Sequence, residues 1–124
     1  MSTRCDIIIR DNKPSGEKIK LFHRLDGYPQ GVGKFLIENV LKKLKESPNF
    51  KVNEVANFLV KNKEDEDYMI TTGRHPDIEY RYLINVDTKE IKCWKVHYKR
   101  ESDTLFSFYK DYEVNLEDEI LNKN

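Results

Sequence analysis

The chain has 124 residues, a length that suits one domain spanning residues 1–124 and leaves no room for two ordinary ones. Its 22 Lys and Arg residues balance 22 Asp and Glu residues, and a neutral protein of this kind is not expected to bind duplex DNA. No apolar run reaches the roughly 18 residues of a membrane-spanning helix, so we expect no membrane segment.

The N-terminus and the two cysteines predict a cytoplasmic protein. The opening sequence MSTRCDIIIRD lacks the long apolar core of a signal peptide. Cys5 and Cys93 lie far apart in the sequence and match no metal-binding spacing. Buried thiols in a reducing compartment are therefore expected, with a redox pair as the alternative.

Two short runs near the N-terminus predict a β-hairpin. Residues Cys5–Arg10 (CDIIIR) are rich in β-branched side chains, and the turn-forming cluster DNKPSG follows them. Residues Lys18–Leu25 (KIKLFHRL) alternate in polarity, which places His23 on the same face as the apolar residues at 19 and 21. We expect the two runs to pair in antiparallel fashion around Pro14–Gly16.

Two helices are predicted next. Apolar residues recur at helical spacing along one stripe: Val32, Phe35, Leu36, Val40 and Leu44. They predict a helix from Gly31 to Glu46 that ends before Pro48. A shorter helix is predicted from a second stripe: Val52, Val55, Ala56, Leu59 and Val60. The charged run Lys61–Asp67 is expected to be a solvated loop.

The second half of the chain predicts β-strands. The segments YMITTGR, IEYRYLINV and IKCWKVHYKR are rich in β-branched and aromatic residues, with a hairpin turn at Asp87–Glu90 between the last two. A further strand is expected over Leu105–Val114. The predicted fold is α+β: an antiparallel sheet, made of the N-terminal hairpin and a C-terminal meander, with two helices on one side.

The sequence contains no recognisable catalytic or metal-binding motif. A nucleophile elbow, the His-Glu-x-x-His zinc motif and cysteine pairs at zinc spacing are all lacking. The three histidines, His23, His75 and His97, lie in separate segments. A pair of hydrolytic carboxylates stays open as an alternative, although no spacing favours it. We therefore assign no catalytic residue, metal ligand or cofactor.

The segment His23–Leu36 (HRLDGYPQGVGKFL) gathers three of the five glycines just before the first predicted helix. Gly31 and Gly33 allow close approach of the backbone, and the unpaired amides at a helix start favour an anion. Arg24 and Lys34 would add positive charge. The spacing is neither a P-loop nor a dinucleotide fingerprint. A tight corner without a ligand is the structural alternative.

Aromatic and basic residues of the predicted strands form a second cluster. Tyr82 and Trp94, with Tyr28 from the glycine-rich segment, are candidates for stacking on a base. Arg74 and Arg100 are candidates for binding phosphate. One face of the sheet must pack against the helices, so a place in the core is the alternative role for each aromatic residue.

Three parts of the sequence, MSTRCDIIIRD, LFHRLDGYPQGVGKFL and the aromatic strands that carry arginines, resemble the phage Thoeris anti-defence sponge family, in its first-described type. The resemblance covers most of the chain, and its specific part is the motif H-x-x-D-G-Y-P-x-G-x-G from His23 to Gly33. It implies a protein that is not an enzyme, and that binds a cyclic ADP-ribose isomer made by TIR-domain proteins and sequesters it without cleavage. It also implies homodimers or larger homo-oligomers, and cyclic di- or trinucleotides as further ligands.

The expected function is a viral anti-defence sponge that blocks activation of a defence effector in the host bacterial cytoplasm. The expected ligand-binding residues are His23, Arg24, Tyr28, Gly31, Gly33, Lys34, Arg74, Tyr82, Trp94 and Arg100. One alternative is a phage inhibitor that binds another protein, such as an anti-CRISPR, with an exposed apolar or acidic patch. Another is a phosphodiesterase, which would cleave the ligand and depend on a metal.

Overall fold

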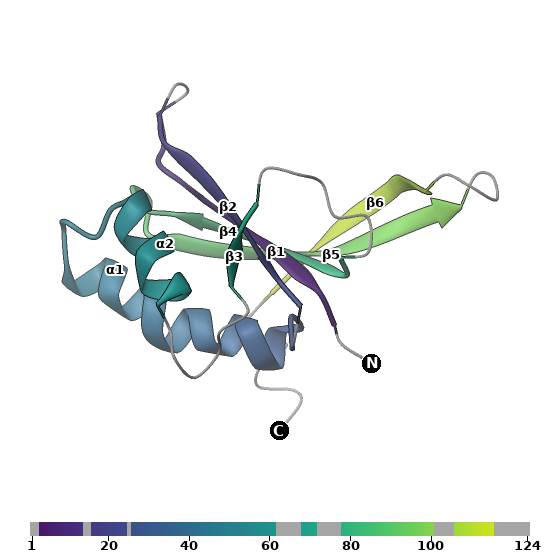
Figure 1. The fold of residues 1–124 in the computed structure, drawn as a ribbon, viewed down its shortest axis with the longest axis horizontal. Coiled ribbons are helices and arrows are strands. Elements are labelled where there is room, and N and C mark those ends of the chain that lie inside the picture. Colours follow the sequence, from purple (N-terminus) through teal and green to yellow (C-terminus); the bar gives the residue numbers. More distant parts are fainter. Residues whose placement is uncertain are drawn as a thin grey trace.

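The computed structural model describes residues 3–13, 16–24, 26–61, 68–71, 78–100 and 106–115, with the backbone alone for residues 97–100 and 106–114. These residues form an α+β fold in which helices cover one side of a six-stranded sheet (Figure 1). The strands are β1 (Cys5–Arg10), β2 (Lys18–His23), β3 (Met69–Ile70), β4 (Tyr80–Asn85), β5 (Glu90–Arg100) and β6 (Phe106–Val114). The helical segments are η1 (Pro29–Gly33), η2 (Leu36–Leu41), α1 (Lys42–Glu46) and α2 (Val52–Val60).

The strands lie in the order β3-β2-β1-β4-β5-β6. The hairpin β1–β2 and the meander β4–β5–β6 are antiparallel, which confirms these two parts of the prediction. The prediction of a wholly antiparallel sheet is wrong, because β1 pairs with β4 in parallel, with Asp6 opposite Arg81. The chain passes through β2, the helices and β3 between these two strands. A long connection of this kind is what parallel neighbours require.

The helices agree with the apolar stripes of the sequence. Residues 29–46 are helical without interruption, so the first helix ends at Glu46 as predicted and begins slightly earlier, at Pro29. Proline suits this first position because its fixed φ is already helical and the amide it lacks would be unpaired there. η1 and η2 have π-helical hydrogen bonds; the amide of Lys34, for example, donates to the carbonyl oxygen of Pro29. In α2 the predicted stripe is buried except for Val60, which is 41% exposed.

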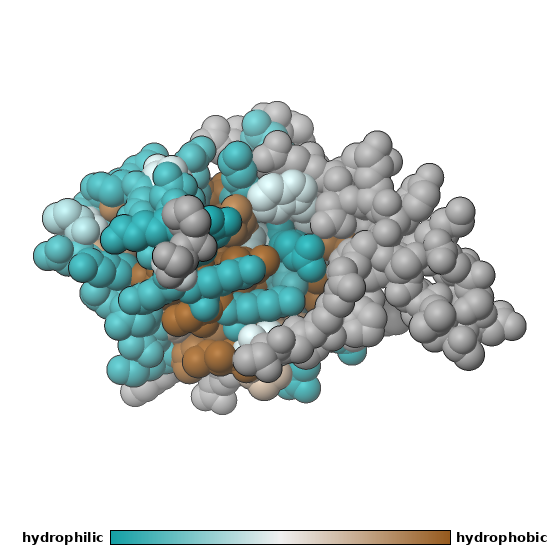
Figure 2. Space-filling model, turned by 90° about the horizontal axis from the view of Figure 1, so that it is seen from above, coloured by the Kyte–Doolittle hydropathy of each residue, from teal (hydrophilic) through white to brown (hydrophobic). Residues whose placement is uncertain are grey.

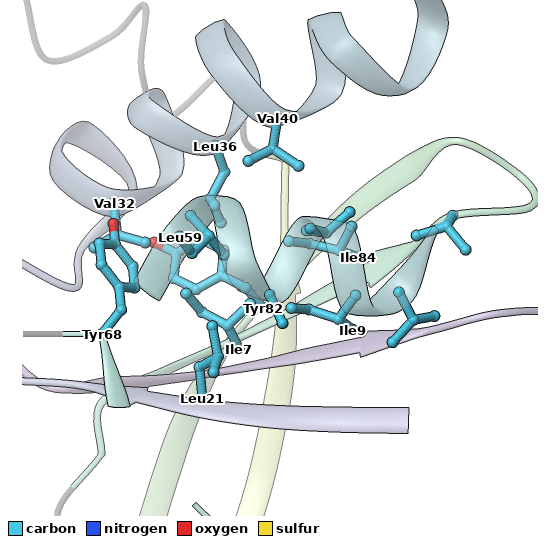
Figure 3. Close-up of a cluster of buried hydrophobic side chains, with 14 of the residues drawn as sticks. Ile7, Ile9, Leu21, Val32, Leu36, Val40, Leu59, Tyr68, Tyr82 and Ile84 are labelled. Carbon is cyan, nitrogen blue, oxygen red and sulfur yellow. The ribbon is translucent and has the colours of Figure 1, made fainter. Parts of the chain in front are cut away.

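The core lies between the helices and one face of the sheet (Figure 3). Its fully buried side chains include Ile7, Ile9, Leu21, Leu36, Val40, Leu59, Tyr82 and Ile84. Ile7 and Ile9 alternate along β1, and Tyr82 and Ile84 alternate along β4, so both strands turn one face to the helices. The residues between them, at positions 6, 8, 81 and 83, point to the opposite face, which the described helices leave uncovered (Figure 1).

Candidate functional site

The uncovered face of the sheet brings basic, aromatic and apolar residues of four strands together. Strand pairing across β2, β1, β4 and β5 arranges them in three successive rows: Phe22, Asp6, Arg81 and Trp94; then Lys20, Ile8, Leu83 and Lys92; then Lys18, Arg10, Asn85 and Glu90. We refer to these residues as the open face. Figure 2 shows this side of the molecule, where hydrophilic side chains lie beside and across a band of hydrophobic ones.

A buried carboxylate organises the first row of the open face. Asp6 is fully buried, and its Oδ1 accepts a hydrogen bond from Nε of Arg81 at 3.1 Å. Its Oδ2 accepts from Nη2 of Arg81 at 3.4 Å and lies 3.4 Å from Nζ of Lys20. A carboxylate without water must be paired, and here it has two cationic partners. The group of three therefore keeps a net positive charge and fixes the plane of the Arg81 guanidinium.

A groove of about 340 Å³ runs over the open face. Its lining combines one large aromatic ring, an aliphatic pair and three cations: Trp94, Ile8, Leu83, Arg10, Lys18 and Arg81. None of these described lining residues carries a negative charge. Apolar side chains with a few fixed polar groups are typical of small-molecule sites. A flat ring next to guanidinium and ammonium groups matches a ligand that carries both a base and phosphate.

Two of the predicted stacking residues lie on opposite faces of the sheet. Trp94 is half-buried and borders the groove, so the structure keeps it as a candidate. Tyr82 is fully buried in the core, where its hydroxyl donates a 2.7 Å hydrogen bond to the carbonyl oxygen of Gly27. Burial also raises the pKa of Tyr82 far above the ordinary value for a tyrosine. The core role, which the sequence left open for every aromatic residue, holds for Tyr82.

His23 is buried on the helix side of β2. It is fully buried, and its ring lies 4.1 Å from the ring of Tyr68, measured between centroids. This burial places His23 in the packing of the fold and away from the groove on the opposite face. His23 therefore packs at the end of β2, just before the glycine-rich corner, rather than beside the groove.

The glycine-rich corner uses its amides within the fold. The amide of Gly27 donates to the carbonyl oxygen of Thr3, that of Gly31 to Tyr28, and that of Val32 to Asp26, at 2.8–2.9 Å. Gly33 is buried, and a Cβ on Gly31 would meet the carbonyl oxygen of Asp26. The amides of Gly27, Gly31 and Val32 are thus already bonded within the fold, which favours the tight-corner alternative for this segment.

The other predicted residues of the corner lie on the surface. Tyr28 is 36% exposed, and its hydroxyl donates a 3.2 Å hydrogen bond to Asp26, which raises the pKa of Tyr28. Arg24 is exposed, as is Lys34, whose Nζ lies 3.9 Å from a carboxylate oxygen of Glu38. None of the three lines the groove.

Two residues predicted to bind phosphate have no described side chain. Arg74 lies outside the described residues, and Arg100 ends β5 with only its backbone described. Both stay predictions.

Sequence reasoning missed most of the groove, including Arg81, Arg10 and Lys18. The available signal was a single charged residue, Asp6, within the apolar run CDIIIR, because a carboxylate there must be paired with a cation from a neighbouring strand. The identity of that cation depended on the parallel pairing of β1 with β4.

The comparisons give no relative from which a role could be transferred. No protein-family model matches the chain, and neither the curated proteins nor the solved structures contain a significant match. Within the described part of the chain, no helix has the length and apolar character needed to cross a membrane. The same residues contain no group of three or more His, Cys, Asp or Glu side chains placed to hold a metal ion.

Proposed function

We propose that this protein is a non-catalytic sponge that binds and sequesters a cyclic ADP-ribose-type signal in the groove of the open face. The observation that carries the proposal is the position of Trp94 beside a groove lined by Arg81, Arg10 and Lys18. A cyclic ADP-ribose isomer offers adenine for the indole ring and pyrophosphate for the cations. The choice of this signal rests on the sequence resemblance, and the groove is chemically suited to it.

The groove has enough interactions for useful affinity. A base stacked on an aromatic ring contributes about 1–3 kcal/mol, and a hydrogen bond to a charged group about 1.5–3 kcal/mol. One stack with two or three cationic contacts is therefore sufficient for binding in the micromolar to nanomolar range, after the cost of association. Retention of the signal requires no catalytic group. The proposed biological role is to keep a TIR-dependent effector inactive in the host bacterial cytoplasm, with the protein acting as a homodimer or larger homo-oligomer.

Isothermal titration with a cyclic ADP-ribose isomer tests this function. We expect saturable binding, and heating the complex should release the ligand with its mass unchanged. A matched variant, Trp94→Ala, should bind more weakly, whereas Tyr28→Ala, which lies outside the groove lining, should bind as the wild type does. Recovery of a cleaved product would favour the phosphodiesterase alternative, and the absence of binding heat would remove the sponge proposal.

A second candidate function is inhibition of another protein through the edge strand β3. Met69 is 47% exposed and Ile70 is 66% exposed, and β3 is the outermost strand on its side of the described sheet. An apolar edge of this kind is suited to strand addition by a partner. Ile70→Lys would weaken such an interaction and leave ligand binding in the groove unchanged. If Ile70→Lys instead weakened ligand binding and left inhibition of the partner protein unchanged, β3 would be excluded as the functional surface.

A further inference from the structure

The groove of the open face has two chemically different ends. Trp94 and Arg81 occupy the first row of the open face, and Arg10 occupies the third, next to Lys18. Arg10 lies four positions after Asp6 of the first row, which corresponds to roughly 13 Å at the usual rise of a strand. Ile8 and Leu83 form an apolar floor between the two ends.

We propose that Arg10 and Lys18 form a second anion subsite, so that the groove takes a linear nucleoside diphosphate with its base on Trp94 and its terminal phosphate at this end. The proposal shares the groove with the proposed function but names a different ligand class. A base alone would leave the second end empty. An extended nucleoside diphosphate has a length comparable with the separation of the two ends.

The charges around this end favour an anion. Nε of Arg10 donates a 3.0 Å hydrogen bond to the carbonyl oxygen of Asp11, which holds the side chain along the hairpin. Among the described residues, no carboxylate forms an ion pair with Arg10 or Lys18. The nearby carboxylate of Asp11 accepts the backbone amides of Lys13 and Glu17, at 3.0 and 3.2 Å, and is thus held in the turn.

A neighbouring hollow shows why the phosphate should lie toward β1 and β2. This hollow, of about 210 Å³, shares Leu83 with the groove and lies toward the turn between β4 and β5. Its lining includes Glu90 beside Lys92, together with Asn12, Asn85 and Thr88. The Glu90 carboxylate would repel a phosphate there, whereas the described residues that line the groove at Arg10 and Lys18 contribute only positive charge.

Titrations with adenosine, AMP and ADP at one ionic strength test the second subsite, with the fluorescence of Trp94, the single tryptophan, as the readout. Affinity should rise from adenosine to AMP to ADP. The double variant Arg10→Gln, Lys18→Gln should weaken ADP binding about tenfold or more and leave adenosine unchanged. The control Lys42→Gln, Lys45→Gln removes the same charge from exposed positions of α1 and should change neither titration.

Equal affinity of the wild type for adenosine and ADP would overturn the second subsite, as would an unchanged ADP affinity in the Arg10, Lys18 variant. A parallel titration with a cyclic ADP-ribose isomer separates this outcome from failure of the proposed function. If the cyclic ligand binds and the linear series shows no dependence on phosphate, the second subsite alone is wrong. If ADP binds as described and the cyclic ligand does not, the proposed function is wrong and the subsite stands.

Discussion

Asp6 of β1 and Arg81 of β4 face each other across the parallel strand pair, with Oδ1 of the carboxylate 3.1 Å from Nε of the guanidinium. This contact connects the fold to the candidate site. The parallel pairing brings the two residues opposite each other, and the buried carboxylate then holds Arg81 where it lines the groove. Asp6 is thus a positioning residue, which acts on a ligand only through its cationic partners.

Asp6→Asn should lower both stability and affinity. The amide keeps the size of the side chain but removes the charge that pairs with Arg81 and Lys20. Breaking a buried pair costs about 3–5 kcal/mol, and the roughly one-fifth exposure of both cations reduces the expected loss to about 1–3 kcal/mol. Urea denaturation measures this loss in the free energy of unfolding. Glu38→Gln, which removes an exposed contact with Lys34, should change stability by less than about 0.5 kcal/mol. Equal effects of the two variants would contradict the role of Asp6.

Trp94→Ala should weaken ligand binding by about 1–3 kcal/mol, or roughly 5- to 150-fold, because the base loses its stacking surface. Titration calorimetry measures this loss. Trp94→Phe keeps an aromatic ring and should recover part of the affinity, which distinguishes stacking from a general packing effect. If the phenylalanine variant binds no better than the alanine variant, the ring does not stack on the ligand.

The local elements of the fold could be predicted, whereas the direction of a distant strand pair could not. Residue type and turn chemistry determine the hairpin β1–β2 and the turn between β4 and β5, which the sequence predicts at Asp87–Glu90 and which lies one residue earlier, at residues 86–89. The apolar pattern of β1 is the same for a parallel and an antiparallel neighbour. The pairing of β1 with β4 depends on the path of the chain through the helices, which leaves no local signal.

The candidate site was predictable only in part for the same reason. Strand alternation separates the two faces within each strand, but it shows neither how the faces of β4 and β5 match nor which face the helices cover; the register places Tyr82 and Trp94 on opposite faces. Arg81 became a groove residue only through its pairing with Asp6. In the glycine corner, the sequence alone does not distinguish a glycine that lets a ligand approach the backbone from one that avoids a steric clash within the fold. The bonded amide of Gly31 distinguishes the two.

Tyr82→Phe should destabilise the protein at neutral pH and reduce its sensitivity to alkali. The variant loses the 2.7 Å hydrogen bond to Gly27, at a cost of about 1–3 kcal/mol for a buried carbonyl left unpaired. Burial raises the pKa of Tyr82, so the folded protein keeps this proton above pH 10, the ordinary tyrosine pKa, while the unfolded chain releases it. Stability conferred by the neutral hydroxyl is thus present below about pH 10 and falls as the pH rises further, by about 1.4 kcal/mol per pH unit.

Denaturant titrations of the wild type and Tyr82→Phe between pH 7 and about pH 11 measure this difference. The stability curves should converge as the pH rises, because only the wild type has this hydroxyl to ionise on unfolding. Parallel curves across the whole range would show that Tyr82 does not contribute to the alkaline loss of stability.

Gly31→Ala should destabilise the fold without a specific effect on the ligand. A Cβ at this position would meet the backbone carbonyl of Asp26, which also accepts the amide of Val32. Relief of this contact requires movement of the corner, and we expect a loss of about 1–3 kcal/mol. Thermal unfolding measures the loss. The folded variant should bind the ligand with wild-type affinity, since Gly31 does not line the groove. A loss of affinity with unchanged stability would instead support a ligand-binding role for the corner.

A crystal structure of the protein with a bound cyclic ADP-ribose isomer tests the central claim most directly. We expect the adenine to stack on the indole of Trp94 and the pyrophosphate to lie within hydrogen-bonding distance of Arg81, Arg10 or Lys18. A ligand seated instead against Gly31 and Gly33, with no contact to the open face, would contradict the account.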